Sequence, residues 1–197
     1  MAKANDRPLE GYHLLLCVTG GVAAYKSADL ASKLTQGAAV VDVAMTDAAQ
    51  QFIAPLTFQA LTARRVYTTM WQPAEDFRSQ HLSLTEAADL MVVAPATADI
   101  LAKMACGLAD DLVSTLALSA CGACPILVAP AMNTRMWNAP PTQRNLQTLR
   151  DTGVRAVGPG EGNLACGTTG PGRMAEPAEI LAAIIDMLRN TPPKSKR

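Results

Sequence analysis

The segment that most constrains the fold is the apolar run Tyr12–Thr19, which is closed by Gly20 and Gly21. A continuous apolar run of this length, ended by glycines, is typical of a β-strand that is buried on both faces. The following residues, about 23–36, change to helical spacing and end at a glycine stop. This order of strand, tight turn and helix is the unit from which parallel sheets are built.

The same alternation continues along the chain. Further predicted strands span residues 39–45, 65–68, 89–94, 125–129 and 154–157, and predicted helices include residues 55–63, 138–152 and 177–188. This order predicts an α/β, doubly wound (Rossmann-like) fold with a mostly parallel sheet and helices on both faces. Residues 1–189 are expected to form one domain. The glycine-rich stretch 158–172 is expected to be a long loop that acts as a lid or binding element.

Composition excludes several classes of protein. Lys plus Arg equals Asp plus Glu, at 17 each, so no basic field is present to attract nucleic acid. The basic cluster in residues 190–197 is interpreted as part of a polar, solvated tail. No apolar run approaches the roughly 20 residues of a membrane span, and no apolar signal segment opens the chain, which favours the cytoplasm. Charged residues make up only 17%, against about 25% in typical domains, which hints at contacts between subunits.

The five cysteines are expected to be reduced thiols, because an odd number without an export signal does not suggest a disulfide framework. Cys121 and Cys124 form a C-x-x-C pair, but no second pair or suitably spaced histidine completes a zinc site. Cys17 and Cys106 are interpreted as core residues. No metal is expected.

Ligands of parallel sheets collect at the carboxyl ends of the strands, and two of these ends could hold an anion. Thr19–Ala24 contains two glycines that permit close backbone approach, and the helix after it offers free N–H groups. The full G-x-G-x-x-G spacing is absent, so a plain tight turn is an equal alternative. The second strand ends at Thr46, a hydroxyl rather than a ribose-binding acid, which favours a monophosphate ligand over a dinucleotide.

Two further strand ends carry small and polar side chains. The fourth strand runs into APATAD at residues 94–99, where Thr97 and Asp99 can donate and accept hydrogen bonds beside a flat ligand. Thr97 could equally cap the next helix. The fifth strand ends in PAMN, where Asn133 could orient a carboxylate or simply form a turn.

Two residues could move protons. Imidazole is the side chain best suited to proton transfer near neutral pH, so His81 is a candidate, although a lone histidine is more often structural or solvated. His13, at the start of a strand, is assigned a structural role. Cys166 lies in the glycine-rich stretch as Ala165-Cys166-Gly167, where a thiol would be exposed enough to react.

Read together, the longer motifs TGGVAAYKS, HLSL before AADL, APATADILAKMACGLADDL, PAMNTRMW and ACGTTGPGRMAEP are far more specific than any one strand end. On these motifs, from about Leu14 to Glu176, the chain resembles the homo-oligomeric flavin-containing cysteine decarboxylases. The resemblance implies a six-stranded flavoprotein fold, trimers or dodecamers, and FMN near a subunit interface. It implies FMN contacts at Gly20, Gly21, Val22, Ala23, Thr46, Thr97, Ala98, Asp99 and Met132. Asp99 stands where some members have an amide.

The resemblance also implies the chemistry. Within the family, the motifs are most similar to those of enzymes that convert 4′-phosphopantothenoylcysteine, a small-molecule substrate, to 4′-phosphopantetheine in coenzyme A synthesis. Direct loss of CO₂ from a cysteine would leave an unstabilised carbanion. Oxidation by the flavin, assisted by His81, would first give a thioaldehyde that draws electrons from the carboxylate. The resulting enethiolate would then be reduced with a proton from Cys166, while Asn133 and Ala165 bind the substrate.

Several alternatives stay open. A peptidyl-cysteine (lantibiotic-type) decarboxylase would stop at the enethiol and need no proton donor at Cys166. A flavin prenyltransferase fits the PAMNTRMW and ACG motifs less well. A non-catalytic regulatory subunit of a protein phosphatase, or a bare nucleotide-binding module, would not need the proton-transfer residues. In many bacteria this decarboxylase is fused to a synthetase, which is expected here on a separate protein unless the chain is an excised domain.

Overall fold

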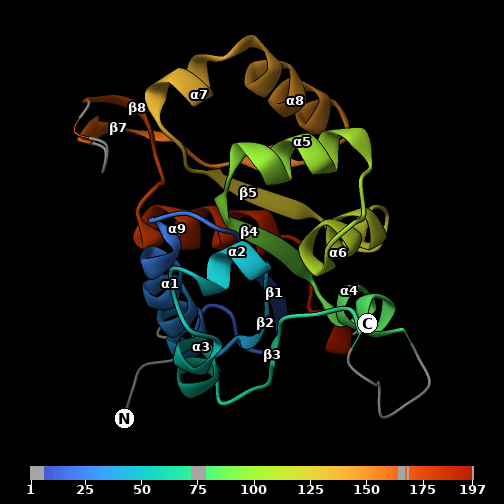
Figure 1. The fold of residues 1–197 in the computed structure, drawn as a ribbon. Coiled ribbons are helices and arrows are strands. Elements are labelled where there is room, and N and C mark those ends of the chain that lie inside the picture. Colours follow the sequence, from blue (N-terminus) through green and yellow to red (C-terminus); the bar gives the residue numbers. More distant parts are fainter. Residues whose placement is uncertain (1–6, 72–78, 164–166, 168, 197) are drawn as a thin grey trace.

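The computed structural model describes residues 7–71, 79–163, 167 and 169–196. Its centre is a six-stranded sheet in the order β3-β2-β1-β4-β5-β6, in which every neighbouring pair is parallel (Figure 1). The strands are β1 (His13–Val18), β2 (Val40–Met45), β3 (Val66–Tyr67), β4 (Leu90–Ala96), β5 (Ile126–Pro130) and β6 (Arg155–Ala156). The predicted doubly wound α/β fold with six parallel strands is therefore confirmed.

Helices cover both faces of the sheet because its central strands are apolar on both sides. One face carries α1 (Ala24–Gln36), α3 (Pro55–Thr62) and α9 (Pro177–Leu188). The other carries α4 (Gln80–Ala87), α5 (Ala98–Cys106), α6 (Leu112–Ala120) and α8 (Pro140–Asp151). In β1, Leu14 and Leu16 face the first of these cores and Leu15 and Cys17 face the second. The short helices α2 (Asp47–Gln50) and α7 (Thr134–Asn138) follow β2 and β5.

The stretch expected as a long loop is not one throughout. It contains an antiparallel pair, β7 (Gly160–Asn163) and β8 (Thr169–Arg173), which stands apart from the main sheet (Figure 1). This corrects the prediction for residues 158–172. The two strands are glycine-rich and pair through backbone hydrogen bonds. The sequence therefore lacks the alternation of apolar side chains that would predict a strand. Its base is fixed because Met132 N donates to Gly172 O at 2.9 Å.

The C-terminal segment also differs from its prediction. Lys194, in the 3-10 helix Lys194–Lys196, donates from its backbone N to Asp89 Oδ1 at 2.6 Å. Its ammonium group donates to Glu86 O at 2.9 Å and to Ala123 O at 3.0 Å. The segment is therefore docked beside the amino ends of β4 and β5 and is not a solvated tail. The prediction failed because these partners come from distant parts of the chain.

The structure also bears on what the sequence indicated about cysteines, metal sites and membrane-spanning helices. Cys17 is buried as predicted, but Cys106 is exposed, because it is the last residue of α5 and precedes the turn at Gly107. Over the residues that the structure describes, no group of three or more His, Cys, Asp or Glu side chains could hold a metal ion. Within the same ranges, no helix combines the length and apolar character needed to cross a membrane.

Candidate functional site

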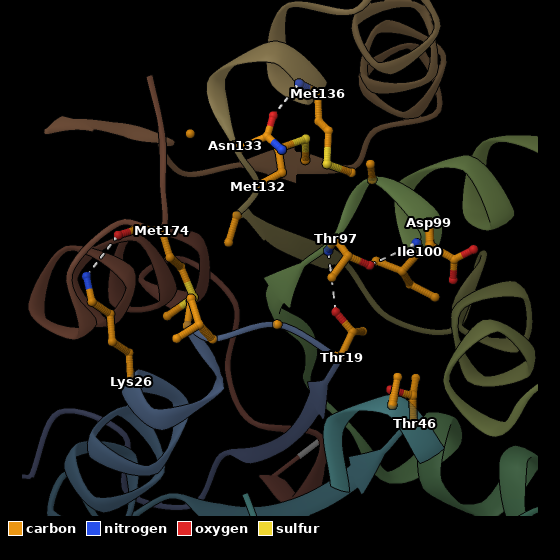
Figure 2. Close-up of a pocket in the computed structure, with 18 of the residues that line it drawn as sticks. Thr19, Lys26, Thr46, Thr97, Asp99, Ile100, Met132, Asn133, Met136 and Met174 are labelled. Carbon is orange, nitrogen blue, oxygen red and sulfur yellow. Dashed lines mark hydrogen bonds between the residues drawn. The ribbon is translucent and has the colours of Figure 1, made fainter. Parts of the chain in front are cut away.

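A cavity of about 840 Å³ opens at the carboxyl edge of the sheet. It lies between the start of α1, the β2–α2, β4–α5 and β5–α7 connections, and the end of β8 (Figure 2). This volume is within the usual range of about 300–1,000 Å³ for small-molecule sites. Its position is the one expected of a ligand site in a doubly wound sheet.

Three strand-end residues both shape this cavity and start the helices beside it. Thr46 Oγ1 accepts from Ala49 N at 3.1 Å, Thr97 Oγ1 from Ile100 N at 3.3 Å, and Asn133 Oδ1 from Met136 N at 2.8 Å. Each side-chain oxygen thus caps the N-terminus of a helix. Because the caps use the acceptor atoms, the two hydroxyl protons and the amide NH₂ group remain to donate to a ligand. The two readings of Thr97 and Asn133, as caps and as ligand-facing residues, are compatible.

The β1–α1 connection offers a different kind of donor. The residue before α1, Ala23, provides no side-chain cap, but Ala24 N donates to Gly21 O at 2.9 Å and Lys26 N to Ala23 O at 3.0 Å. Of the first turn, the N–H of Tyr25 remains for an anion. At Gly20, a Cβ atom would collide with the side chain of Ala48 and lie 2.9 Å from its carbonyl carbon. At Gly21, a Cβ would meet only Thr97 Cγ2 at 3.9 Å. Gly20 is therefore required by close packing, whereas the surrounding protein leaves room for a Cβ atom at Gly21.

Most residues predicted for the site are brought together. Those that line the cavity are Gly20, Gly21, Val22, Ala23, Thr46, Thr97, Ala98, Asp99, Met132 and Asn133. His81 does not line it: this residue lies half-buried in the first turn of α4, where its carbonyl accepts from Thr85 Oγ1 at 2.9 Å. Ala165 and Cys166 lie outside the described residues. The individual roles of all these side chains stay predictions.

Besides Asp99, the cavity wall contains charged residues that were not predicted from the sequence. Lys26, only 7% exposed, donates to Met174 O at 3.2 Å (Figure 2). It also donates to Glu176 Oε1 at 2.9 Å. The same Glu176 oxygen accepts from Arg173 Nη2 at 2.6 Å. The hydrogen bond from Lys26 holds the pKa of Glu176 below its usual value. Lys26 was part of the motif TGGVAAYKS, but its partners, about 150 residues away, could not be read from the pattern.

The opposite wall contains Asp99, Lys103 and Asp111. Lys103 Nζ lies 2.7 Å from Asp111 Oδ2 and 3.6 Å from Asp99 Oδ2. The spacing of four residues between Asp99 and Lys103 is a sequence signal for this ion pair. The side chain of Asp99 therefore faces an ammonium group of its own helix.

The residues present fit a flavin mononucleotide. Ile100, Met132 and Met174 supply apolar surface for a flat ring, and the donors of Thr46, Thr97 and Asn133 suit its carbonyl-bearing edge and its phosphate. The start of α1 adds the N–H of Tyr25 for an anion. The fold and cavity together define a doubly wound mononucleotide-binding domain.

Comparison with known proteins narrows this class. Residues 2–189 match the family described as Flavoprotein, and the chain belongs to that family. It is 47% identical over 174 residues to the coenzyme A biosynthesis bifunctional protein CoaBC of Vibrio cholerae, covering 88% of this chain and 43% of that protein. The chain thus spans less than half the length of this curated relative.

Solved structures are similar over nearly the whole chain. One is a PPC decarboxylase mutant complexed with pantothenoylaminoethenethiol, with a TM-score of 0.81 and 32% identity over 92% of this chain and 100% of that one. Another is the FMN-dependent cysteine decarboxylase SpaF, with a TM-score of 0.78 and 32% identity over 90% of this chain and 97% of that one.

Proposed function

We propose that this protein is an FMN-dependent decarboxylase that converts 4′-phosphopantothenoylcysteine to 4′-phosphopantetheine in the cytoplasm, as a step of coenzyme A synthesis. The observation that carries the proposal is the convergence of four separate strand ends on one cavity. There the hydroxyl groups of Thr46 and Thr97, which suit a flavin, line the same cavity as the amide of Asn133. The similarity to a coenzyme A biosynthesis protein and to a PPC decarboxylase supports it.

Bound FMN supplies a reversible two-electron acceptor, which allows a cysteine to be oxidised before its carboxylate leaves and reduced afterwards. The chain contributes the surroundings. The N–H of Tyr25 at the start of α1 would donate to the flavin phosphate, and Thr46 and Thr97 would donate to the cofactor. The Asn133 amide NH₂ would orient the substrate carboxylate without a formal charge, which avoids overstabilising the group that must be lost.

Proton transfer is assigned to His81 and Cys166. Because His81 does not line the cavity of its own chain, we propose that a neighbouring copy in a trimer or dodecamer supplies it. Two observations support a subunit contact at this edge: Val22 and Tyr25 line the cavity, yet they are 58% and 63% exposed in the single chain. Exposed apolar side chains at the rim of a site are typical of an interface.

The direct test is to record the absorption spectrum of the purified protein, incubate it with 4′-phosphopantothenoylcysteine and identify the product by mass spectrometry. We expect a flavin spectrum and loss of one CO₂ with no net oxidation. A colourless protein that takes up no FMN would contradict the proposal.

Two variants separate the steps. His81→Asn should abolish CO₂ release while the protein keeps its flavin. Cys166→Ser should release CO₂ but accumulate the enethiol; normal saturated product from this variant would refute the role of the thiol.

Mixing tests the shared site. His81→Asn and Asn133→Ala subunits, each inactive alone, should regain part of the activity after dissociation and reassembly together. This would occur because some interfaces then combine an intact His81 with an intact Asn133. Absence of recovery in oligomers that demonstrably contain both subunits would place the two residues in the same subunit's site.

The similarity to SpaF favours a second candidate, oxidative decarboxylation of a peptide with a C-terminal cysteine. The same assay with such a peptide distinguishes the two. Turnover of the peptide, with an enethiol as end product and no reaction of 4′-phosphopantothenoylcysteine, would favour the alternative.

A further inference from the structure

One wall of the cavity is an ion cluster with unequal charges. Lys103 Nζ lies 2.7 Å from Asp111 Oδ2, 3.0 Å from Asp110 Oδ1 and 3.6 Å from Asp99 Oδ2. The Lys103 side chain is only 18% exposed, whereas those of Asp99 and Asp110 are 74% and 63% exposed. One ammonium group thus serves three carboxylates, and three of these four residues line the cavity.

The backbone explains how the three carboxylates meet. Helix α5 is followed by its C-cap Gly107, which adopts a left-handed conformation with φ +70°, and Leu108 N donates to Lys103 O at 2.9 Å. The chain therefore turns back along α5 and carries Asp110 and Asp111 to the Lys103 side chain. Asp111 also caps α6, because its Oδ1 accepts from Ser114 N at 2.9 Å. Lys103 consequently links the start of α5, its end and the start of α6.

The electrostatics of the cluster depend on this one cation. The hydrogen bond with Asp111 holds the pKa of Lys103 above its ordinary value, and the hydrogen bond with Lys103 holds that of Asp110 below. Without the ammonium group, three carboxylates from two segments would face one another. Their mutual repulsion would push the connection at residues 107–111 away from α5.

We propose that Lys103 is a positioning residue for the flavin site: it offsets part of the charge of Asp99, Asp110 and Asp111 and thereby holds the 107–111 connection against α5, which keeps Asp111 in the cavity wall. The inference rests on the proposed flavin occupancy of this cavity, but not on the reaction catalysed there. It differs from direct attraction of the FMN phosphate by the lysine, because a wall matters for any flavin, charged or not.

The test uses the full chain, titrated with FMN and, separately, with riboflavin, which lacks the phosphate. Lys103→Met should weaken the binding of both flavins by about tenfold or more, and Lys103→Arg should restore most of it. The matched control is Lys33→Met. Lys33 forms the same kind of four-residue pair with Asp29, at 3.0 Å, away from the cavity, and its substitution should leave flavin binding unchanged.

Two further measurements identify repulsion as the cause. The loss of flavin affinity in Lys103→Met should become smaller in 1 M salt. There the screening length of charges is about 3 Å, compared with about 8 Å at about 0.15 M salt. Adding Asp110→Asn to Lys103→Met should recover part of the lost affinity. If the methionine variant does not fold, as judged by circular dichroism, Lys103→Gln is tested in the same way.

The outcomes are separable. Wild-type affinity in Lys103→Met would overturn the inference. A defect confined to FMN would do the same, and so would one that neither salt nor Asp110→Asn relieves. If the wild-type protein bound neither flavin, the proposed function would fail and the inference with it. A wild-type protein that binds flavin but decarboxylates nothing would leave the positioning role standing.

Discussion

The amino and carboxyl edges of the central sheet, where the parallel strands begin and end, differ in how their charged side chains are paired. At the amino edge, the carboxylate of Asp42, 3% exposed, is held between His13 Nε2 and the guanidinium of Arg64 through Nε, each 2.6 Å away. At the carboxyl edge, Lys103 faces three carboxylates beside the cavity. In the closed core, the buried carboxylate has a cationic partner in Arg64. Where the chain lines the ligand site, three carboxylates share one cation. We therefore expect substitutions at the amino edge to change stability, and those at the carboxyl edge to change binding.

The largest stability effect should come from Asp42→Asn. Removing one partner of a buried ion cluster costs roughly 3–5 kcal/mol, and we expect about 2–4 kcal/mol here because Arg64 is 43% exposed. Chemical denaturation measures the loss, and FMN titration should show unchanged affinity. The control is Asp186→Asn, whose exposed partner Arg155 lies 3.5 Å away and which should cost less than about 0.5 kcal/mol. Weaker FMN binding without lower stability would break the comparison.

The contribution of Asp42 to the stability of the fold should also depend on pH in the acid range. Burial alone would raise the pKa of Asp42, but hydrogen bonds from His13 and Arg64 outweigh it and hold the pKa below its ordinary value. A carboxyl group with a lowered native pKa stabilises the fold above its unfolded value of about 3.9, and this contribution is lost as pH falls through the native value. The stability difference between wild type and Asp42→Asn should therefore shrink as the pH falls below about 4. A difference that grows below that pH would refute this assignment.

The next effect belongs to the carboxyl edge and compares two adjacent glycines. Gly20→Ala places a Cβ against Ala48, so the β1–α1 connection must shift. Overpacking of about 1–3 kcal/mol corresponds to roughly 5- to 150-fold weaker binding of FMN if the strain falls on the bound form. Gly21→Ala meets only ordinary van der Waals contact and should bind within a few-fold of wild type. Equal behaviour of the two variants would show that this connection does not shape the binding site.

The smallest effect tests a residue that serves both fold and site. Thr97→Ala removes the cap on Ile100 N and should cost about 1 kcal/mol of stability, with weaker FMN binding in addition. Thr97→Ser keeps the capping oxygen and should restore both properties. Denaturation and flavin titration of the same two variants provide the measurement. Lost stability with unaltered FMN affinity would reduce Thr97 to a cap.

The sheet and the floor of the site were predictable because both follow from local sequence. Continuous apolar runs identified β1, β4 and β5, and parallel topology places the residues after them at one edge. The hairpin β7–β8 was missed because glycines pair through the backbone and leave no side-chain pattern. Helix α4 was not predicted either; it is short, and its apolar positions have no clear helical periodicity.

The two lysines of the cavity wall were not predicted for another reason. Lys26 and Lys103 lie in helices, where a lysine is usually solvated, and only the fold brings Glu176 or Asp110 to them. His81 was identified as a candidate from its motif, yet a single chain does not bring it to the cavity. Pattern within one sequence carries no information about what a neighbouring copy would supply.

The docked C-terminal segment has a practical consequence. Lys194 is fastened to Asp89 and Ala123, beside the amino ends of the strands, while the cavity opens at their carboxyl ends. A biotinylated extension that follows the docked segment would therefore begin on the side of the sheet away from the opening. A molecule immobilised on a sensor chip through such a tag would have its cavity opening directed toward the solution.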